Sequence, residues 1–165
     1  MKRIFLLSLS LLLLLAGCQG KREDPLAYQD GDFSFTGIFL LDGMECKAEF
    51  TQTVVDGKAE RRLTYLAPEP LAGFSFRSLD GLIFASYGED EVELRDAEAA
   101  MRIFSLFDIP KDASLAGKST ADGVTEMVFS VDGGSYTVKI KEGEDFPFSI
   151  VYTGGEYGVA LRIEK

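Results

Sequence analysis

The sequence predicts a mainly β protein: a strongly curved antiparallel sheet, a half-barrel of about ten or eleven strands, that wraps around one hydrophobic helix. Three observations lead to this prediction. Apolar and polar residues alternate with period two over most of the chain, as in strands that bury one face. The period changes to that of a helix only once, between residues 97 and 107. Dipeptides typical of tight hairpin turns separate the alternating runs: Asp42-Gly43, Asp56-Gly57, Asp80-Gly81, Gly133-Gly134 and Gly154-Gly155.

The expected strands follow one another from residue 33 to residue 163. The segment 44–51 alternates most regularly, with an apolar side made of Met44, Cys46, Ala48 and Phe50. The segment 82–87 is apolar on both faces, which favours a more central strand. A sheet with this many strands curls rather than stays flat, and its phenylalanines are then expected on the concave side.

The expected helix spans residues 97–107, with Asp96 as its cap and Pro110 as its stop. Its polar residues share a single narrow stripe: Glu98, Arg102 and Ser105. The apolar remainder covers most of the circumference, far more than in an ordinary surface helix. We therefore expect the helix to be covered on more than one side, inside the curved sheet.

Composition excludes several classes of function. The chain has 165 residues, of which 46% are hydrophobic and 12% aromatic, so it suits one folded domain and is too apolar for a disordered protein. Its formal charge of −10 argues against nucleic acid as a partner, because phosphate backbones repel acidic proteins. The absence of histidine removes Ser-His and Cys-His catalysis and the commonest metal ligand. No nucleotide-binding or hydrolase motif occurs either, so we expect no enzyme activity and no cofactor.

Acidic clusters are the remaining signal for chemistry, at residues 30–32, 89–93 and 142–145. None of these clusters has the ligand spacing of an EF-hand calcium site. Acidic residues in solvent-exposed turns account for all three clusters. Two carboxylates could in principle perform glycosidase chemistry, but spacing cannot select one pair in so acidic a chain. We therefore expect no metal site.

The first 17 residues have the features of a bacterial lipoprotein signal. Lys2 and Arg3 form a short positive region, and the apolar residues 4–15 are fewer than the about 20 that a membrane-spanning helix needs. The following Leu15-Ala16-Gly17-Cys18 matches the lipobox. Cleavage before Cys18 makes it a lipidated N-terminus, whose acyl chains, such as palmitate, hold the protein on the extracytoplasmic face of the cell membrane. Removing the two positive charges of the signal changes the formal charge from −10 to −12.

Three regions follow: the signal peptide at 1–17, a lipidated N-terminus and polar tether at 18–31, and one folded domain at 32–165. With Cys18 lipidated, Cys46 is the only cysteine left, so no intramolecular disulfide can form. Its position on the apolar face of a strand favours a buried thiol, and an intermolecular disulfide is the alternative.

Two passages of the sequence carry a resemblance. One is LTYLAPEPL at residues 63–71, followed by the Phe74-Ser75-Phe76 strand and the Asp80-Gly81 turn; the other is the closing DFPFSI at residues 145–150. Both resemble the bacterial lipoprotein-carrier family, the LolA/LolB-like half-barrels. The resemblance covers about residues 32–164, mostly as architecture. It implies a curved sheet that shelters acyl chains in an apolar cavity.

The resemblance is nearer to the lipid-anchored members than to the soluble periplasmic carrier, because that carrier has no lipobox. Lipoproteins of this fold in spore-forming Firmicutes include a germination lipoprotein that is understood as the partner of a cortex-processing amidase. The sequence shows no exposed apolar loop of the kind that the outer-membrane receptor uses for delivery.

Two functions therefore stay open. In one, the concave face binds a lipid acyl chain or a similar hydrophobic ligand; in the other, a non-catalytic interaction lipoprotein recruits or activates an envelope or spore-cortex enzyme such as an amidase. The first predicts ligand contacts on the concave face and the helix: Phe35, Phe39, Phe50, Phe74, Phe76, Met101, Phe104, Phe129 and Phe148. The same side chains would equally suit a packed core, because hollow and filled half-barrels need the same alternation.

Overall fold

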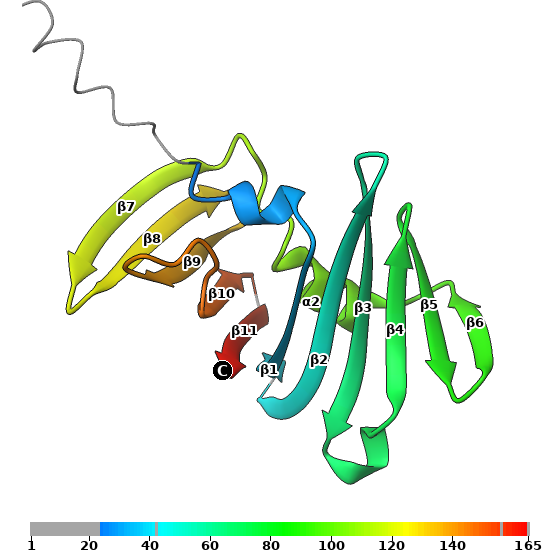
Figure 1. Ribbon diagram of the computed structural model, residues 1–165. Coiled ribbons are helices and arrows are strands. Elements are labelled where there is room, and N and C mark those ends of the chain that lie inside the picture. Colours follow the sequence, from blue (N-terminus) through cyan, green and yellow to red (C-terminus); the bar gives the residue numbers. More distant parts are fainter. Residues whose placement is uncertain (1–23, 42, 156, 165) are drawn as a thin grey trace, which may run out of the picture.

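The computed structural model describes residues 24–41, 43–155 and 157–164. They form one open, curved antiparallel sheet of eleven strands and one short α-helix (Figure 1). The fold class expected from the sequence is confirmed. The strands are β1 (Phe33–Leu41), β2 (Met44–Val55), β3 (Lys58–Ala67), β4 (Phe74–Leu79), β5 (Leu82–Tyr87), β6 (Asp90–Leu94), β7 (Ser114–Ala121), β8 (Val124–Val131), β9 (Gly134–Lys141), β10 (Ser149–Gly154) and β11 (Tyr157–Glu164).

The chain builds the sheet in two halves. The strand order is β6-β5-β4-β3-β2-β1-β11-β10-β9-β8-β7, so β1 lies in the middle. Successive hairpins lead outward from β1 to the edge strand β6, and others lead from the opposite edge strand β7 inward to β11. Helix α2 (Glu98–Ser105) lies in the connection between the two edges. This connection brings α2 against β1 in the middle of the sheet (Figure 1).

Strand pairing places apolar residues side by side on the concave face. At the turns, Asp56-Gly57 and Asp80-Gly81 have positive φ at both positions, as the two-residue hairpins expected there require. The resulting register aligns the apolar positions of neighbouring strands across both halves: Ala85, Phe76, Leu63, Phe50 and Phe35 in one direction, and Phe39, Leu161, Ile150, Val138 and Met127 in the other.

Helix α2 is shorter than the sequence pattern predicts. It begins after Ala97 rather than Asp96, with no side-chain cap, and Leu106 and Phe107 form a turn after its last residue. Ala100, Ile103 and Phe104 are buried, but the side chain of Met101 is 56% exposed. The expected cover on more than one side of the helix is thus absent at Met101, which lies on the exposed side of α2, and its role as a ligand contact stays a prediction.

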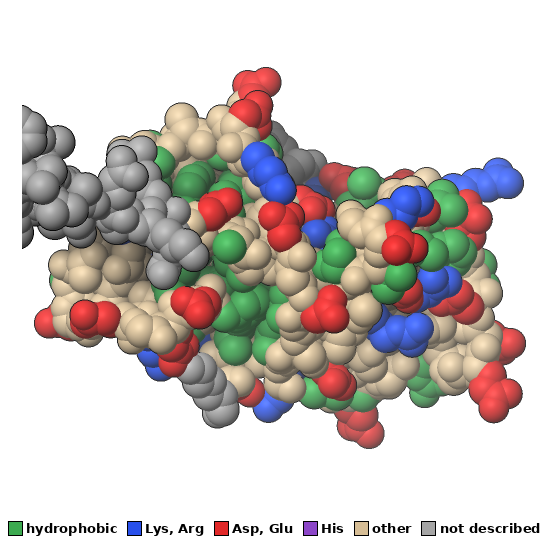
Figure 2. Space-filling model, turned by 45° about the horizontal axis from the view of Figure 1, so that its top comes forward, with side chains coloured by type: hydrophobic (Ala, Val, Ile, Leu, Met, Phe, Trp, Pro, Cys, Tyr) green, Lys and Arg blue, Asp and Glu red, His purple; other side chains and the backbone are tan. Residues whose placement is uncertain are grey.

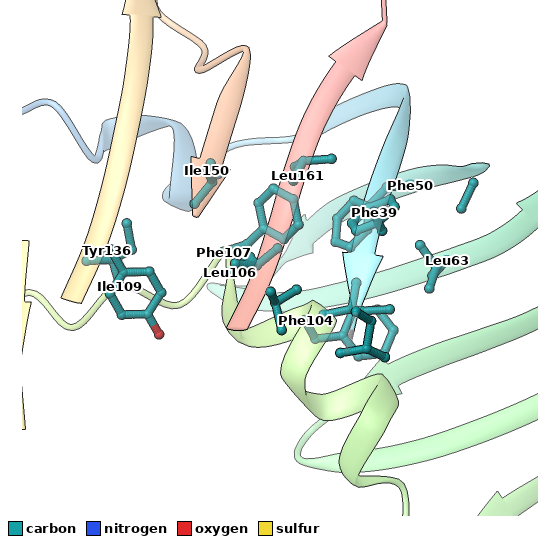
Figure 3. Packing of buried hydrophobic residues seen from close by; sticks show 14 of the residues in the cluster. Phe39, Phe50, Leu63, Phe104, Leu106, Phe107, Ile109, Tyr136, Ile150 and Leu161 are labelled. Carbon is teal, nitrogen blue, oxygen red and sulfur yellow. The ribbon is translucent and has the colours of Figure 1, made fainter. Parts of the chain in front are cut away.

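The core lies between the concave side of the sheet and α2 with the turn that follows it (Figure 3). The Phe50 ring centroid lies 4.3 Å from that of Phe107 and 6.0 Å from that of Phe104. Leu106 and Ile109 are buried beside them. Cys46 is buried, as its place on the apolar face of β2 predicted, and burial raises the pKa of its thiol.

Strand β5 occupies a different place from the one its composition suggests. It is second from the edge of the sheet, next to β6, and not central. Its alternate residues Ile83 and Ala85 are buried on the concave side, while Phe84 on the convex side lies under the Arg77 guanidinium, 4.4 Å from the ring centroid. On the convex face of β5, which the apolar pattern predicted to be buried, Phe84 is therefore covered by a cation–π contact with Arg77.

The described chain starts with a short 3₁₀ helix, η1 (Ala27–Asp30), that packs on the sheet. Tyr28 of η1 is buried in the core cluster, so the end of the segment expected as a tether lies against the domain. The expected signal peptide and Cys18 lie outside the described residues. Among the residues that are described, no helix is long and apolar enough to cross a membrane.

Candidate functional site

The centre of the concave face is filled by protein. Phe104 and Phe107 are at most 3% exposed, and the rings of Phe35 and Phe50 lie 5.4 Å apart beside them. The sequence pattern was compatible with both a packed core and a hollow half-barrel. At the centre of the concave face, the structure has a packed core (Figure 3).

The predicted contact residues fall into different environments. Phe39, Phe50, Phe104 and Phe129 are buried, and Phe35 packs against the same cluster. Phe74 and Phe76 are half-buried on β4, with ring centroids 5.5 Å apart.

Phe148 does not belong to the buried cluster formed by the described residues. Its ring lies 5.5 Å from the Lys141 ammonium group. The reason is local: residues 146–148 precede β10 and include Pro147, so the period-two count does not apply to them. Phe146 is the phenylalanine of this segment that packs against the core.

A cavity of about 710 Å³ opens beside the packed centre, between η1, the ends of β8 and β9, and the β9–β10 loop. Its apolar wall contains Tyr28, Phe33, Met127, Ile140 and Phe146. The Phe146 ring lies 5.3 Å from Tyr28 and 4.9 Å from Phe33, so aromatic contacts join this wall to the core. Figure 2 turns this end of the molecule forward and shows hydrophobic side chains in a hollow among acidic and basic ones.

Charged residues form the rim of this cavity, and acidic ones predominate. The acidic residues are Asp24, Asp32, Glu142, Glu144 and Asp145, and the basic ones are Lys118 and Lys141. An apolar wall beneath a charged rim can hold a hydrophobic group inside and keep a polar group in water.

A buried polar network holds η1 and the segment after α2 in place. The Gln52 amide donates to the carbonyl oxygens of Gln29 and Gly31, at 2.8 Å each. The Arg61 guanidinium donates to the Gln52 side-chain oxygen at 2.8 Å and to both carboxylate oxygens of Asp108 at 2.5 and 2.7 Å. Four separate segments are thereby joined at the end of the molecule that carries the cavity.

A second apolar surface lies on the outer strands of the first half-sheet. Tyr87 is 66% exposed and Val92 is 62% exposed. Tyr87 pairs with Phe74 across β4 and β5, and the two ring centroids lie 6.2 Å apart. We call Phe74, Phe76, Tyr87 and Val92 the outer apolar surface.

The buried tyrosines near the core are unsuited to acid–base chemistry at neutral pH. Burial raises the pKa of Tyr28 and Tyr136, and it raises the pKa of Tyr65 to about 12, so these phenols stay neutral. Within the described ranges, no three His, Cys, Asp or Glu side chains are grouped to hold a metal ion.

Sequence reasoning missed most of the cavity wall. Met127, Ile140, Phe33 and Phe146 could be assigned to apolar faces, but nothing in the pattern separated a cavity wall from the core. Tyr28 offered a signal of its own, as an aromatic residue within the polar stretch 19–32.

No protein-family model matches the chain, and the search of curated proteins found no match. Several solved structures are similar. MucB is 17% identical over 84% of this chain and 54% of its own length, with a TM-score of 0.51. A DUF1329 family protein from Desulfovibrio piger is 9% identical over 86% of this chain and 89% of its own, with a TM-score of 0.51. A putative outer membrane lipoprotein-sorting protein domain from Vibrio parahaemolyticus is 9% identical over 85% of this chain and 87% of its own, with a TM-score of 0.45.

The chain spans about half the length of MucB, so the likeness concerns one part of that protein. At these identities, the likeness to MucB and to the DUF1329 family protein is one of fold, and it extends over more than four fifths of this chain. The chain therefore shares the fold of these two proteins, a curved antiparallel sheet with a helix on its concave side.

Proposed function

We propose that this protein is an exported lipoprotein, anchored through Cys18 on the extracytoplasmic face of the membrane, that holds a lipid acyl chain or a similar hydrophobic group. The observation that carries the proposal is the cavity of about 710 Å³ beside η1. Its volume lies within the range of small-molecule sites, about 300–1,000 Å³. Signal cleavage, lipidation of Cys18 and a folded domain after the tether are parts of the proposal.

The chemistry of the cavity suits an acyl chain better than a polar ligand. Met127, Ile140 and Phe33 offer apolar contact, which is non-directional and grows with the area removed from water. The charged rim keeps a headgroup or glycerol ester in water. Of the contact residues expected from the sequence, Phe50 and Phe35 adjoin this wall. The Phe50 ring centroid lies 5.8 Å from that of Phe33, and the Phe35 ring centroid lies 5.9 Å from that of Phe146.

The test uses the full chain with Cys18→Ala, so that no covalent lipid interferes. We expect lipid mass spectrometry of the purified protein to detect a bound acyl lipid, and a fluorescent fatty acid to bind and be displaced by palmitate. Ile140→Trp should reduce both signals because the indole occupies the cavity. Leu115→Trp, at an exposed position of β7, is the control.

A denaturant midpoint must show that each variant is folded. If the folded Cys18→Ala protein carries no lipid and binds no fatty acid, the proposal is wrong.

The outer apolar surface favours a second function, that of an interaction lipoprotein. Exposed Tyr87 and Val92 beside half-buried Phe74 suit a protein partner better than open solvent. The partner that the resemblance suggests is an envelope or spore-cortex amidase, as for the germination lipoproteins of spore-forming Firmicutes. A Tyr87→Ala, Val92→Ser double variant should then weaken binding to the purified amidase and leave fatty-acid binding unchanged. If the double variant and the parent protein bind the amidase equally well, the outer apolar surface is not the binding site.

A further inference from the structure

The cavity lies at the point where the described chain begins. Asp24 and Pro25 themselves line its edge, and Tyr28 contributes to its wall. We propose that one acyl chain of the lipid on the protein's own Cys18 occupies this cavity. The inference rests on the proposed function, because it requires both the lipid on Cys18 and an acyl-binding cavity.

The start of the domain is held firmly at the cavity edge. The backbone N–H of Leu26 donates to the Asp24 carboxylate at 2.9 Å, and Gln52 bonds the carbonyl oxygens of Gln29 and Gly31. Lys111 adds an ion pair with Asp30, with the nitrogen and oxygen 3.0 Å apart. Any group attached a few residues before Asp24 therefore starts from a fixed point beside the opening.

The length of chain before this point matches the distance that the lipid must cover. Cys18 precedes Asp24 by six positions, and a fully extended segment of that length spans roughly 20 Å. The segment is thus long enough to turn back to the opening and too short to carry the lipid far from it. A short tether gives an attached ligand an effective concentration on the order of millimolar. A free lipid competes with the attached chain at a disadvantage.

Charge favours the same arrangement. Lys21 and Arg22 are the two cations between Cys18 and Asp24. The rim that they approach carries five acidic residues and two lysines. When the acyl chain enters the cavity, these cations come near the carboxylates of the β9–β10 loop, which include Glu142 and Asp145.

The occupancy gives the protein two states. With all chains of its lipid in the bilayer, the cavity is open to an incoming acyl group. With one chain in the cavity, the site is closed and the membrane anchor is weaker, because fewer buried chains hold the protein. An acyl ligand that enters the cavity thus returns the protein's own chain to the bilayer.

Photo-cross-linking tests the inference on the intact lipoprotein. Cells are grown with a diazirine-bearing palmitate, which is incorporated into the lipid on Cys18. The labelled protein is purified, placed in phosphatidylglycerol vesicles and irradiated, and the cross-links are mapped by peptide mass spectrometry. We expect intramolecular cross-links to the cavity wall, on the peptides that contain Met127, Ile140 and Phe146. Cross-links to phospholipid or to a second copy of the chain alone would overturn the inference, as would the absence of label on Cys18.

Two variants with matched controls sharpen the result. Ile140→Trp should abolish the intramolecular cross-links, and Leu115→Trp should leave them unchanged. The double variant Lys21→Gln, Arg22→Gln should lower the yield of the intramolecular cross-links. The matched double variant Lys58→Gln, Arg62→Gln on β3 should leave that yield unchanged. If both Gln pairs behave alike, the charge argument is wrong.

Failure of this inference is distinguishable from failure of the proposed function. If the Cys18→Ala protein binds fatty acid but the lipidated protein gives no intramolecular cross-link, the proposed function stands and the occupation of the cavity by the protein's own acyl chain is excluded. A Cys18→Ala protein that binds no fatty acid removes both.

Discussion

Tyr28 and Tyr136 are both buried tyrosines, but their hydroxyl groups have different surroundings. The Tyr136 hydroxyl donates to the Ser105 carbonyl oxygen at 3.3 Å. The Tyr28 hydroxyl has no partner in hydrogen-bond geometry among the described residues. Burial is the largest influence on Tyr28 and raises its pKa, while the neighbouring Gln29 side chain lowers it. A buried polar group without a partner costs about 1–3 kcal/mol of desolvation that no bond returns.

We therefore expect Tyr28→Phe to leave the free energy of unfolding unchanged or to raise it, since the substitution removes the hydroxyl and keeps the ring that packs on Phe146. Tyr136→Phe should lower it by about 0.5–1.5 kcal/mol, because a hydrogen bond is lost. Urea denaturation of both variants measures the difference. A larger loss for Tyr28→Phe than for Tyr136→Phe would show that the Tyr28 hydroxyl has a polar partner.

At the scale of single elements, α2 is stabilised by packing on one of its faces. Phe104 is 3% exposed and packs on Phe50, whereas Met101 of the same helix is 56% exposed. Phe104→Ala should lower the free energy of unfolding by about 3–5 kcal/mol, through lost transfer energy and the cavity left behind. Met101→Ala should change it by no more than about 0.5 kcal/mol. Similar denaturant midpoints for the two variants would mean that the centre of the concave face is hollow.

Strand β1 depends on a glycine at its centre. A Cβ atom on Gly37 would lie 2.8 Å from Leu161 Cδ1 and 3.1 Å from the Arg162 carbonyl oxygen. Because Leu161 is itself fully buried in the core, it cannot move aside without cost. We expect Gly37→Ala to lower the free energy of unfolding by about 1–3 kcal/mol.

Gly158 on the neighbouring β11 is the matched control, because it is exposed and a Cβ atom there would lie 3.8 Å from its nearest neighbour, the Tyr152 carbonyl oxygen. Gly158→Ala should stay within about 0.5 kcal/mol of the parent in the same urea titration. If Gly37→Ala changes the free energy of unfolding as little as Gly158→Ala does, β1 and β11 can move apart to accommodate the added methyl group, and the close packing at Gly37 is not essential.

At the scale of the whole molecule, the proposed membrane attachment depends on one residue outside the folded domain, Cys18. Cys18→Ala should abolish incorporation of labelled palmitate and move the exported protein from the membrane fraction to the soluble one, because no described helix can take over the anchoring. Cell fractionation with immunoblotting measures the distribution. The Cys46→Ala variant is the control, since that thiol is buried in the sheet and should not be lipidated. Unchanged fractionation of Cys18→Ala would contradict the anchor.

The fold could be predicted because its information is local. Alternation in β2 and the Asp-Gly turns after β2 and β4 depend on neighbouring residues, and each determines a strand face or a hairpin without reference to the rest of the chain. Local information no longer determines the position of a side chain where regular structure stops. Phe148 precedes β10 and falls outside the alternation, and Met101 belongs to a helix whose orientation depends on the sheet.

The sequence by itself determined the strand pattern, the presence of a helix after Asp96, the acidic surface and the candidate anchor at Cys18, because periodicity, turn chemistry and charge can be recognised in short stretches of chain. Only the tertiary structure decided that α2 fills the centre of the concave face and that the open cavity lies beside η1. It also decided that Arg61 pairs with Asp108, 47 residues away. These features depend on how the two halves of the sheet close around the α2 connection, and long-range packing of this kind leaves no periodic signal in the sequence.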